Sequence, residues 1–477
     1  MSPRSMPVLL VAVLAVLCTA SVTAFHTPSS PSAPSIWGAK RGAASAAALT
    51  TRRQAAADGE AVENVLSPKQ ERRRIIQSPN FHRQGFKAES EGVESQMVSE
   101  FTSQLINEMK DSTYTFQKGD LTIKLAKSFG FCWGVERAVA MAYEARAHFP
   151  EQRIHITNEI IHNPGVNERL ADMNIDFLPV DEGKKQFEHI EKDDVVILPA
   201  FGATIQEMQL LDKKGVQIVD TTCPWVAKVW TAVEKHRKLE STSVIHGKWN
   251  HEETIATASF ADVYIIVKDI HEAEYVCNYI VNGGDKAEFM EKFKNAVSEG
   301  FDPDVDLEKV GLANQTTMYK RETRAIGKLF EKTMMHKYGP AEVKNHYAEF
   351  DTICDATQER QDAITDLMEE KLDFILIVGG FDSSNTAHLK EIPHMQHIPS
   401  FHIDRAERIS ADGSIEHREI DGSIVKTANF LPDGPLTIGV TSGASTPDAY
   451  LQEAIERLFL LRTLKGQEAP QKDTVNA

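Results

Sequence analysis

Three cysteines in polar turns lie far apart along the sequence, at Cys132, Cys223 and Cys354. No two of them form a local Cys-x-x-Cys pair, so a shared centre requires three distant parts of the chain to meet. Three thiolates are one ligand short of closing a tetrahedral metal site or a four-cysteine iron–sulfur cluster, which leaves one position free for a substrate. The alternative is three small buried side chains, since free cysteine is among the most buried residue types. The polar surroundings favour the metal or cluster interpretation.

Two polar segments are typical of anion-binding helix starts. Ser383, Ser384 and Asn385 follow a Gly-Gly turn at the end of an apolar run, and Ser445 lies in a second such segment. Hydroxyl, carboxamide and unpaired backbone N–H groups at a helix start bind phosphate. Helix capping alone explains either segment. Two of them in one part of the chain, next to a cysteine turn, favour a diphosphate site.

Histidine and carboxylate side chains in two further turns add acid–base groups. His162 follows an apolar pair, and His251 is followed directly by Glu252 and Glu253. Histidine binds phosphate oxygens or relays protons, and a nearby carboxylate serves as acid or base. As alternatives, His162 stabilises its turn and the two glutamates match the dipole of a helix start. A later turn that contains Thr316 offers hydroxyl donors.

One pattern recurs in the segments that must position these side chains: a short apolar run, a polar turn, and a helix-like segment. Such runs occupy residues 195–198, 243–245, 374–378 and 437–440. Strands that alternate with helices form parallel α/β units, and ligands bind at the carboxyl ends of their strands. The sequence therefore predicts an α/β fold of three similar modules with mostly parallel sheets, each introduced by one cysteine.

The expected modules cover residues 121–222, 223–350 and 351–465, and the first opens on an alternating, strand-like run. Residues 58–120 are predicted to form an N-terminal extension on the surface, without chemistry of its own. The polar tail at residues 466–477 is predicted to be disordered.

The composition is that of an ordinary globular protein, with 42% hydrophobic and 25% charged residues among 477. The formal net charge of −17 argues against nonspecific binding to nucleic acid or to an anionic membrane surface. An acidic protein that binds a diphosphate therefore needs locally placed donors.

The N-terminus is predicted to be a bipartite targeting sequence. Residues 1–24 combine Arg4, a short apolar stretch and a small-residue cleavage site, as in a secretory signal peptide. Residues 25–57 contain basic and small residues but no acid, which is typical of a transit peptide. We therefore expect delivery to the stroma of a complex plastid, with no membrane segment in the mature protein. The alternative is a secreted protein with a disordered stalk.

Eight motifs in one order make the chain similar to a known family. The resemblance extends over residues 121–460, and the residues of several motifs are most similar to those of the plant and cyanobacterial branch. The family that they resemble is 4-hydroxy-3-methylbut-2-enyl diphosphate reductase, whose members complete the methylerythritol phosphate pathway to isoprenoid precursors. The motifs are FCWGVERA, NEIIHNP, DTTCPWV, HGKWNHEET, NQTT, ICDATQERQDA, GGFDSSNT and GVTSGASTPD.

The resemblance implies a trefoil of three α/β modules around a [4Fe–4S] cluster held by Cys132, Cys223 and Cys354. The open iron would bind the allylic hydroxyl of the substrate. Two electrons would then remove that hydroxyl as water, which gives isopentenyl diphosphate and dimethylallyl diphosphate. A plastid location would make a ferredoxin-type protein the electron donor.

The resemblance also implies roles for individual side chains. The catalytic group would be Glu253, His251 and Thr316, in which Glu253 delivers a proton and Thr316 orients the hydroxyl. Glu252 is the second candidate for the acid. The diphosphate would be held by His162, His251, Ser383, Ser384, Asn385 and Ser445.

One position departs from the bacterial members of the family, which have a histidine where this chain has Phe201. One diphosphate donor is therefore missing or replaced, and Thr204 is a candidate substitute. Two other function classes stay open: a zinc-dependent phosphoester hydrolase, with three thiolates and a water on the metal, and a cluster-based sensor without catalysis. A sensor needs no diphosphate pocket, so the anion-binding residues separate it from the enzymes.

Overall fold

The computed structural model describes residues 66–181, 184–350 and 352–468. They belong to one compact unit, Asn64–Ala477. The predicted signal peptide and transit peptide lie outside the described residues, as do residues 469–477 of the predicted tail. Among the described helices, none combines the length and the apolar character that crossing a bilayer requires.

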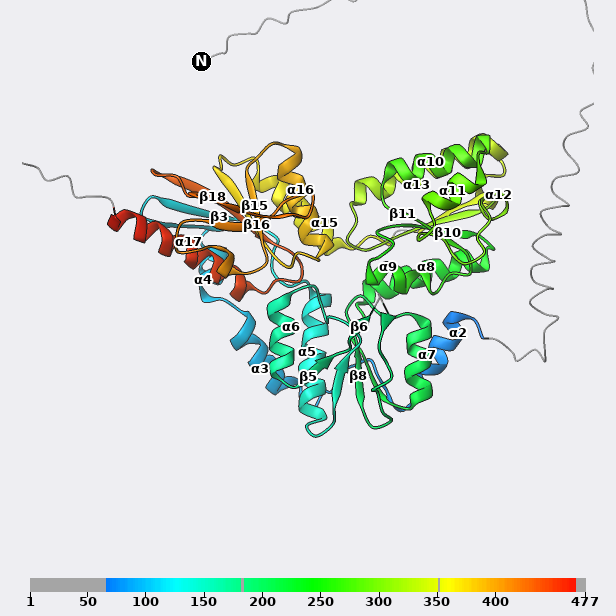
Figure 1. The fold of residues 1–477 in the computed structure, drawn as a ribbon, viewed down its shortest axis with the longest axis horizontal. Coiled ribbons are helices and arrows are strands. Elements are labelled where there is room, and N and C mark those ends of the chain that lie inside the picture. Colours follow the sequence, from blue (N-terminus) through cyan, green and yellow to red (C-terminus); the bar gives the residue numbers. More distant parts are fainter. Residues whose placement is uncertain (1–65, 182–183, 351, 469–477) are drawn as a thin grey trace, which may run out of the picture. The chain divides into compact units, whose positions relative to one another are not determined.

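The first of three large sheets is parallel throughout. Its central strand β8, Val195–Leu198, consists of four buried apolar residues, as expected for a parallel strand that is covered on both faces. The strand order is β1 (Phe81–His82), β9 (Gln217–Asp220), β8, β4 (Ile154–Ile156) and β5 (Ile175–Phe177). The helices near it in Figure 1 are α2 (Pro68–Ile76), α3 (Ser90–Phe101), α5 (Trp133–His148), α6 (Pro164–Asp172) and α7 (Ile205–Lys214). A short antiparallel hairpin joins β6 (Val180–Asp181) to β7 (Lys184–Lys185).

The second sheet is also parallel, and helices cover both of its faces. In Figure 1, α10 and α13 lie above the sheet and α8 and α9 lie below it. The strand order is β11 (Tyr264–Val267), β10 (Thr242–His246), β12 (Val310–Asn314) and β13 (Tyr347–Glu349). The helices are α8 (Pro224–Lys238), α9 (Glu252–Ala258), α10 (Ile270–Asn282), α11 (Lys286–Lys292), α12 (Pro303–Asp306), α13 (Lys320–Tyr338) and α14 (Val343–His346).

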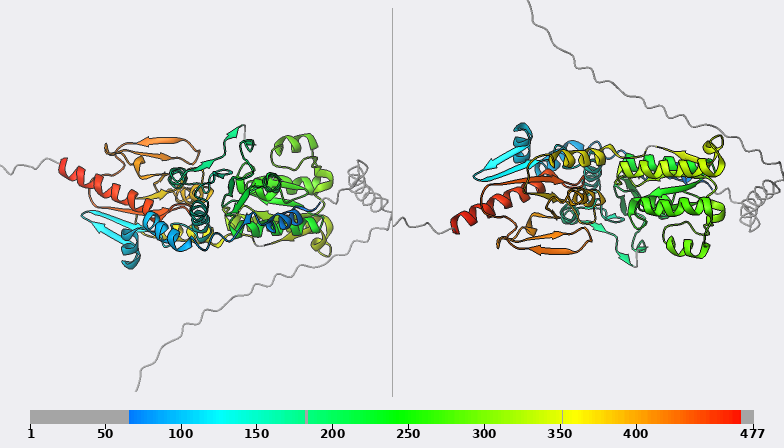
Figure 2. Two further views of the ribbon diagram at one scale, coloured as in Figure 1. Left: turned by 90° about the horizontal axis from the view of Figure 1, so that it is seen from below. Right: turned by 90° about the horizontal axis from the view of Figure 1, so that it is seen from above.

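The third sheet is parallel except for one edge strand. Its order is β15 (Ser400–Ile403), β14 (Phe374–Val378), β18 (Leu436–Ser442), β3 (Leu121–Leu125) and the antiparallel β2 (Thr115–Lys118). The hairpin of β16 (Ile415–Arg418) and β17 (Ile424–Thr427) lies on the opposite side of helix α17 from β2 in Figure 2. The helical elements are α4 (Gln104–Asp111), α15 (Asp355–Leu367), α16 (Ser384–Met395), α17 (Asp448–Glu468) and the 3-10 helix η1 (Ala406–Arg408).

Strand Leu121–Leu125 differs in its partner from the sequence-based expectation, which placed it in the first module. It pairs with β18 in the third sheet, where Leu121, Ile123 and Leu125 are buried with the core of that sheet. Strands that follow one another in a sequence usually lie side by side, so this strand is an exception, and an alternating pattern does not indicate which strand is the partner. The chain therefore passes from the sheet of the third module into the first module near residue 126.

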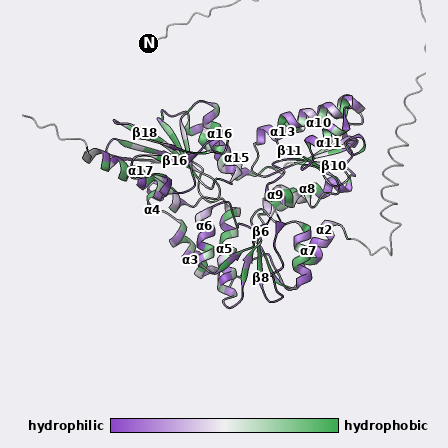
Figure 3. Ribbon diagram, viewed as in Figure 1, coloured by the Kyte–Doolittle hydropathy of each residue, from purple (hydrophilic) through white to green (hydrophobic). Residues whose placement is uncertain are grey.

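The segment expected to be a surface extension contributes to two hydrophobic cores. Val93, Met97 and Phe101 of α3 are buried in the core of the first sheet, and Ile106 and Met109 of α4 in that of the third. Its apolar residues recur at helical spacing, which is the pattern of a packed helix. In Figure 3 the helices show both hydrophilic (purple) and hydrophobic (green) residues, while the central strands are mostly hydrophobic.

Candidate active site

Each of the three cysteines is the N-cap of a helix and immediately precedes its first turn. Cys132 precedes α5, Cys223 precedes α8 and Cys354 precedes α15. All three line one cavity of about 110 Å³, which we call the inner cavity. The fold thus brings together the three distant turns in which the sequence places cysteine.

The surroundings of the thiols suit binding of a metal. An added Cβ on Gly134 would lie 2.5 Å from Cys223 Sγ, so glycine lets the first turn of α5 approach this sulfur. Burial raises the pKa of Cys223 to about 12 and also raises the pKa of Cys354, while backbone N–H groups of their own helices lower both. Such thiols ionise when a bound cation stabilises the thiolate, and the positive ends of three helices favour the same form. The donor set therefore fits an iron–sulfur group.

A buried acid, Glu253, lines the same cavity. Its side chain in α9 is 3% exposed and accepts two hydrogen bonds from Thr316. The Thr316 backbone N–H donates to Oε1 at 2.6 Å, and the Thr316 hydroxyl donates to Oε2 at 2.9 Å. Burial raises the pKa of Glu253 to about 7, although these two hydrogen bonds lower it in part. A carboxyl group with this pKa can hold and release a proton at neutral pH.

The neighbouring Glu252 is tied to a different part of the protein. Its Oε2 pairs with Lys185 Nζ at 2.9 Å, and the same ammonium pairs with Glu207 at 2.9 Å. Glu252 does not line the inner cavity. The geometry therefore separates the two candidate acids and favours Glu253.

Two histidines face each other at the edge of the inner cavity, with ring centroids 5.3 Å apart. His162 Nδ1 is held by Glu159 at 3.0 Å, and its buried Nε2 has no hydrogen-bond partner among the described residues. His251 Nδ1 accepts the Glu253 backbone N–H at 3.2 Å, so a neutral ring carries its proton on Nε2. Burial, aided by nearby His162 and Lys248, lowers the pKa of His251 to about 3. Both Nε2 atoms are thus left for a ligand.

Phe201 forms an aromatic platform instead of supplying a polar donor. Its ring stacks on that of His162 with centroids 4.5 Å apart and an angle of 19° between the planes. Thr204, the suggested substitute donor, caps α7: its hydroxyl accepts the Glu207 backbone N–H at 3.1 Å. Thr204 does not line the inner cavity, so it is not the missing donor.

The serine and asparagine donors come from two loops of the third module. Ser383 is the N-cap of α16, and its hydroxyl accepts the Thr386 N–H at 3.3 Å. Asn385 Oδ1 accepts the Ala444 N–H at 2.9 Å, which leaves its buried Nδ2 without a partner among the described residues. Ser445 Oγ donates to the His162 carbonyl at 3.2 Å and joins the first module to the third. With Ser384, these side chains line the inner cavity.

A second, larger space adjoins the inner cavity. This outer chamber has a volume of about 520 Å³ and shares His162, His251, Ser383 and Ser384 with the inner cavity. Its lining is mainly polar and includes Lys248. A ligand could therefore place an apolar part among the cysteines and an anionic part at the shared donors.

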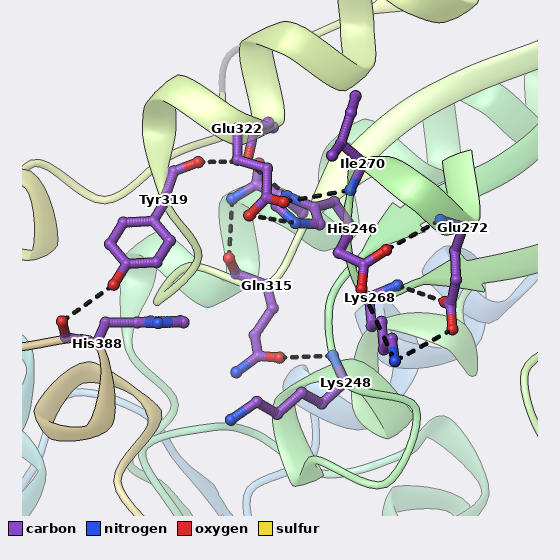
Figure 4. Close-up of polar contacts among 12 residues, drawn as sticks. His246, Lys248, Lys268, Ile270, Glu272, Gln315, Tyr319, Glu322 and His388 are labelled. Atoms are coloured by element: carbon purple, nitrogen blue, oxygen red, sulfur yellow. Dashed lines mark hydrogen bonds and ion pairs between the residues drawn. The ribbon is translucent and has the colours of Figure 1, made fainter. Parts of the chain in front are cut away.

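Two residues outside the predicted set of catalytic and binding residues hold the site together. Gln315 Oε1 accepts the Lys248 N–H at 3.1 Å, and its Nε2 donates to Thr317 Oγ1 at 2.7 Å and to Ser384 Oγ at 3.4 Å. Figure 4 shows the contact with Lys248. Arg360, in the helix that follows Cys354, donates to the Gly130 carbonyl at 2.7 Å and so links two cysteine turns. Only their positions beside Thr316 and Cys354 in the sequence signalled such roles.

The chain matches a family model described as LytB protein over residues 123–459. A curated relative from Gloeothece citriformis is 58% identical over 392 residues, which cover 82% of this chain and 97% of the relative. A relative from Nostoc sp. is 58% identical over 391 residues, with the same two coverages of 82% and 97%. Both proteins are named 4-hydroxy-3-methylbut-2-enyl diphosphate reductase.

Among solved structures, the chain is similar to the E-1-hydroxy-2-methyl-but-2-enyl-4-diphosphate reductase from Plasmodium falciparum. The TM-score is 0.51 and the identity 22%, and the match covers 70% of this chain and 86% of that one. This likeness concerns the fold. It confirms the expected class, a trefoil of three α/β modules with mostly parallel sheets.

Proposed function

Because this chain belongs to the LytB protein family, we propose that it reduces 4-hydroxy-3-methylbut-2-enyl diphosphate to isopentenyl diphosphate and dimethylallyl diphosphate. The reaction consumes two electrons and two protons, breaks the allylic carbon–oxygen bond and releases water. It is the last step of the methylerythritol phosphate pathway. The observation that carries the proposal is that one inner cavity is lined by three cysteines, a buried acid and the diphosphate donors.

Cys132, Cys223 and Cys354 are the proposed ligands of a [4Fe–4S] cluster. No group of three or more His, Cys, Asp or Glu side chains in the described part of the chain could hold a single metal ion. In a cubane cluster each cysteine binds a different iron, so the three thiolates need not meet at one atom. When bound, the cluster would pass two electrons from the external donor to the substrate and would supply a Lewis-acidic iron for the substrate hydroxyl.

Glu253 is the proposed proton donor to the leaving oxygen. Its carboxyl group is buried beside the cysteines, and its raised pKa lets it carry a proton at neutral pH. Thr316 is proposed to fix the carboxyl group and to orient the substrate hydroxyl, since its own hydroxyl lies 2.9 Å from Glu253 Oε2. His251 holds the backbone N–H of Glu253 and so joins the acid to the diphosphate end of the site.

The diphosphate is proposed to bind where the inner cavity meets the outer chamber. The support is a group of polar side chains on four loops. Two of these side chains, His162 and Asn385, have a buried nitrogen atom without a partner in the described structure. Buried polar atoms without a hydrogen-bond partner are costly unless a ligand pairs with them. The proposed binding residues are His162, His251, Ser383, Ser384, Asn385 and Ser445.

The electron donor is proposed to be an acidic protein of ferredoxin type. Trp133, directly after Cys132, is 62% exposed, which is unusual for so large an aromatic side chain. A groove of about 420 Å³ beside helix α8, which begins at Cys223, is lined by four basic residues. They are Lys69, Arg72, Arg73 and Arg83. Arg72 is already paired with Asp220 at 3.2 Å, so Lys69, Arg73 and Arg83 supply the positive charge that is complementary to an acidic carrier in a chain of net charge −17.

A plastid stroma is the proposed location. The cyanobacterial relatives support a plastid-derived enzyme, and the acid-free composition of residues 25–57 supports a transit peptide.

The test is anaerobic purification of residues 58–477, which include the whole compact unit. Iron and sulfide are measured, followed by turnover of 4-hydroxy-3-methylbut-2-enyl diphosphate with dithionite and a viologen. About four irons per chain and formation of both five-carbon diphosphates are expected. Zinc without reductive turnover would contradict the proposal and support the hydrolase. A cluster without turnover would support the sensor.

A further inference from the structure

The proposed diphosphate site is poor in positive charge. Its serine and asparagine donors are neutral, and burial keeps His251 neutral by lowering its pKa. His162 is already paired with the Glu159 carboxylate at 3.0 Å, so a proton on this ring adds no net positive charge to the pair. Phe201 adds an apolar ring where a further donor was expected. A diphosphate carries several negative charges, and removing them from water is costly unless a cation pairs with them. A further cationic residue is therefore expected at this site.

Three cationic side chains line the outer chamber, and two of them are already engaged. Lys390 Nζ donates to the carbonyl and the hydroxyl of Ser400. The Arg418 guanidinium donates to the Phe381 carbonyl. The third cation, Lys248, has an ammonium group with no hydrogen bond or ion pair to any residue that the structure describes.

The backbone of Lys248 is fixed although its ammonium is free. Gln315 Oε1 accepts the Lys248 N–H at 3.1 Å, as Figure 4 shows, and the Lys248 carbonyl accepts the His251 N–H at 3.1 Å. The turn that presents Lys248 is therefore the turn that presents His251. The backbone of Lys248 is thus bound to two parts of the proposed site, the Gln315 amide and the His251 backbone.

The nearby acid Glu391 does not account for the lysine. Its Oε2 is taken by two other groups, His388 Nδ1 at 2.8 Å and the Tyr319 hydroxyl at 2.8 Å. Lys248 influences Glu391 only through space, as a minor cause of the lowered pKa of that carboxyl. Glu391 thus lies within the electrostatic reach of the ammonium but not within ion-pair distance.

We propose that Lys248 binds an oxygen of the substrate's diphosphate and supplies the positive charge that the neutral donors lack. This inference rests on the proposed function and adds a residue to its binding site. A lysine ammonium is a compact charge that suits phosphate oxygens without demanding one geometry. It reaches the shared donors from the outer chamber, so it contacts the anionic end of the substrate and not the reacting carbon.

The test measures binding of inorganic diphosphate to the anaerobic holoprotein by calorimetry. Lys248→Met should weaken binding at least about tenfold, because it removes the unpaired cation, and Lys248→Arg should retain most of the affinity. The matched control is Lys268→Met. Lys268 follows the neighbouring strand β11, and among the residues that the structure describes its ammonium pairs only with Asp269 and Glu272, at 3.8 Å each. Its binding should equal that of the wild type.

The inference and the proposed function fail in different ways. Equal binding by Lys248→Met and the wild type would overturn the role of Lys248 while leaving the reductase intact. A wild-type protein that binds no inorganic diphosphate would overturn this role together with the diphosphate site. With substrate, the expected signature is a raised KM with a smaller change in kcat, which Lys248→Arg restores.

Discussion

The Thr316 backbone and hydroxyl both donate to the Glu253 carboxylate, at 2.6 and 2.9 Å, so the acid is held by two donors from one residue. Glu253 belongs to α9 and Thr316 to the loop after β12, and these two elements lie next to adjacent strands of one sheet. The carboxyl group therefore has a fixed orientation inside a cavity that also contains the cysteines. Fixed orientation is what a proton donor needs in order to act at one atom.

Glu253→Gln should lower kcat at least about a hundredfold, because the amide has the shape of the acid but no proton to deliver. Glu252→Gln is the matched control at the next position, since Glu252 pairs with Lys185 and lines the outer chamber but not the inner cavity. It should change kcat less than about threefold, the scale of an outlying ion pair. Steady-state turnover with a viologen donor measures both. Comparable losses in the two variants would argue against Glu253 as the acid.

The pH profile should show the titration of Glu253. Burial raises the pKa of this carboxyl to about 7, so it is protonated at lower pH and loses its proton as the pH rises. Since the protonated form donates, kcat should fall about tenfold per pH unit on the alkaline side. This alkaline fall in kcat should be absent from the residual activity of the Glu253→Gln variant. A wild-type profile that stays flat to pH 9 would contradict the assignment.

Gly134→Ala should impair cluster binding, because the new Cβ would lie 2.5 Å from Cys223 Sγ. Iron per chain, measured after anaerobic reconstitution, should fall together with activity. Gly92→Ala is the control, since a Cβ at this helical position meets no atom within 4 Å. Full iron content in Gly134→Ala would show that the first turn of α5 can move away from the thiol.

Charge reversal on the basic groove should slow electron delivery by a protein but not by a small molecule. In Arg73→Glu and Arg83→Glu, the rate with reduced ferredoxin should fall about tenfold at low salt, since complementary charge mainly raises the association rate. The rate with dithionite and a viologen should stay unchanged. Lys294→Glu, on the exposed helix-end region of the second module, is the control for a change of net charge. An equal loss with both donors would place the defect in the fold.

The sequence predicted those features that depend on local pattern. The apolar runs at 195–198 and 374–378 form strands with these bounds, because buried parallel strands need continuous apolar residues. The cysteines follow the ends of β3, β9 and β13, where turns after parallel strands are expected to carry functional side chains. These strands belong to three different sheets, so their meeting in one cavity depends on how the modules pack together. The pattern of apolar and polar residues is therefore enough to predict the strands and the turns that follow them.

Other features depend on contacts that no local pattern encodes. Strand Leu121–Leu125 pairs with β18 near the other end of the chain. Its alternation of apolar and polar residues predicts a strand but does not indicate which sheet the strand joins. The separate roles of Glu252 and Glu253 follow from Lys185 and Thr316, which lie far away in the sequence. Gln315 and Lys248 are polar residues in polar turns, and only the packed structure distinguishes them from solvated ones.

The pairing of β3 with β18 also sets an order of assembly. The chain is made from its N-terminus, so Leu121–Leu125 emerges early and has no parallel partner on that side until Leu436–Ser442 has been made. Such distant pairing is slow, because a long intervening segment must first be closed into a loop. Gly130 and Cys132 follow β3 and are fastened to the loop after β18 through Ser442 and Ala444. The wall of the inner cavity that Cys132 forms can therefore be fixed in place only after β18 and the loop that follows it have been made.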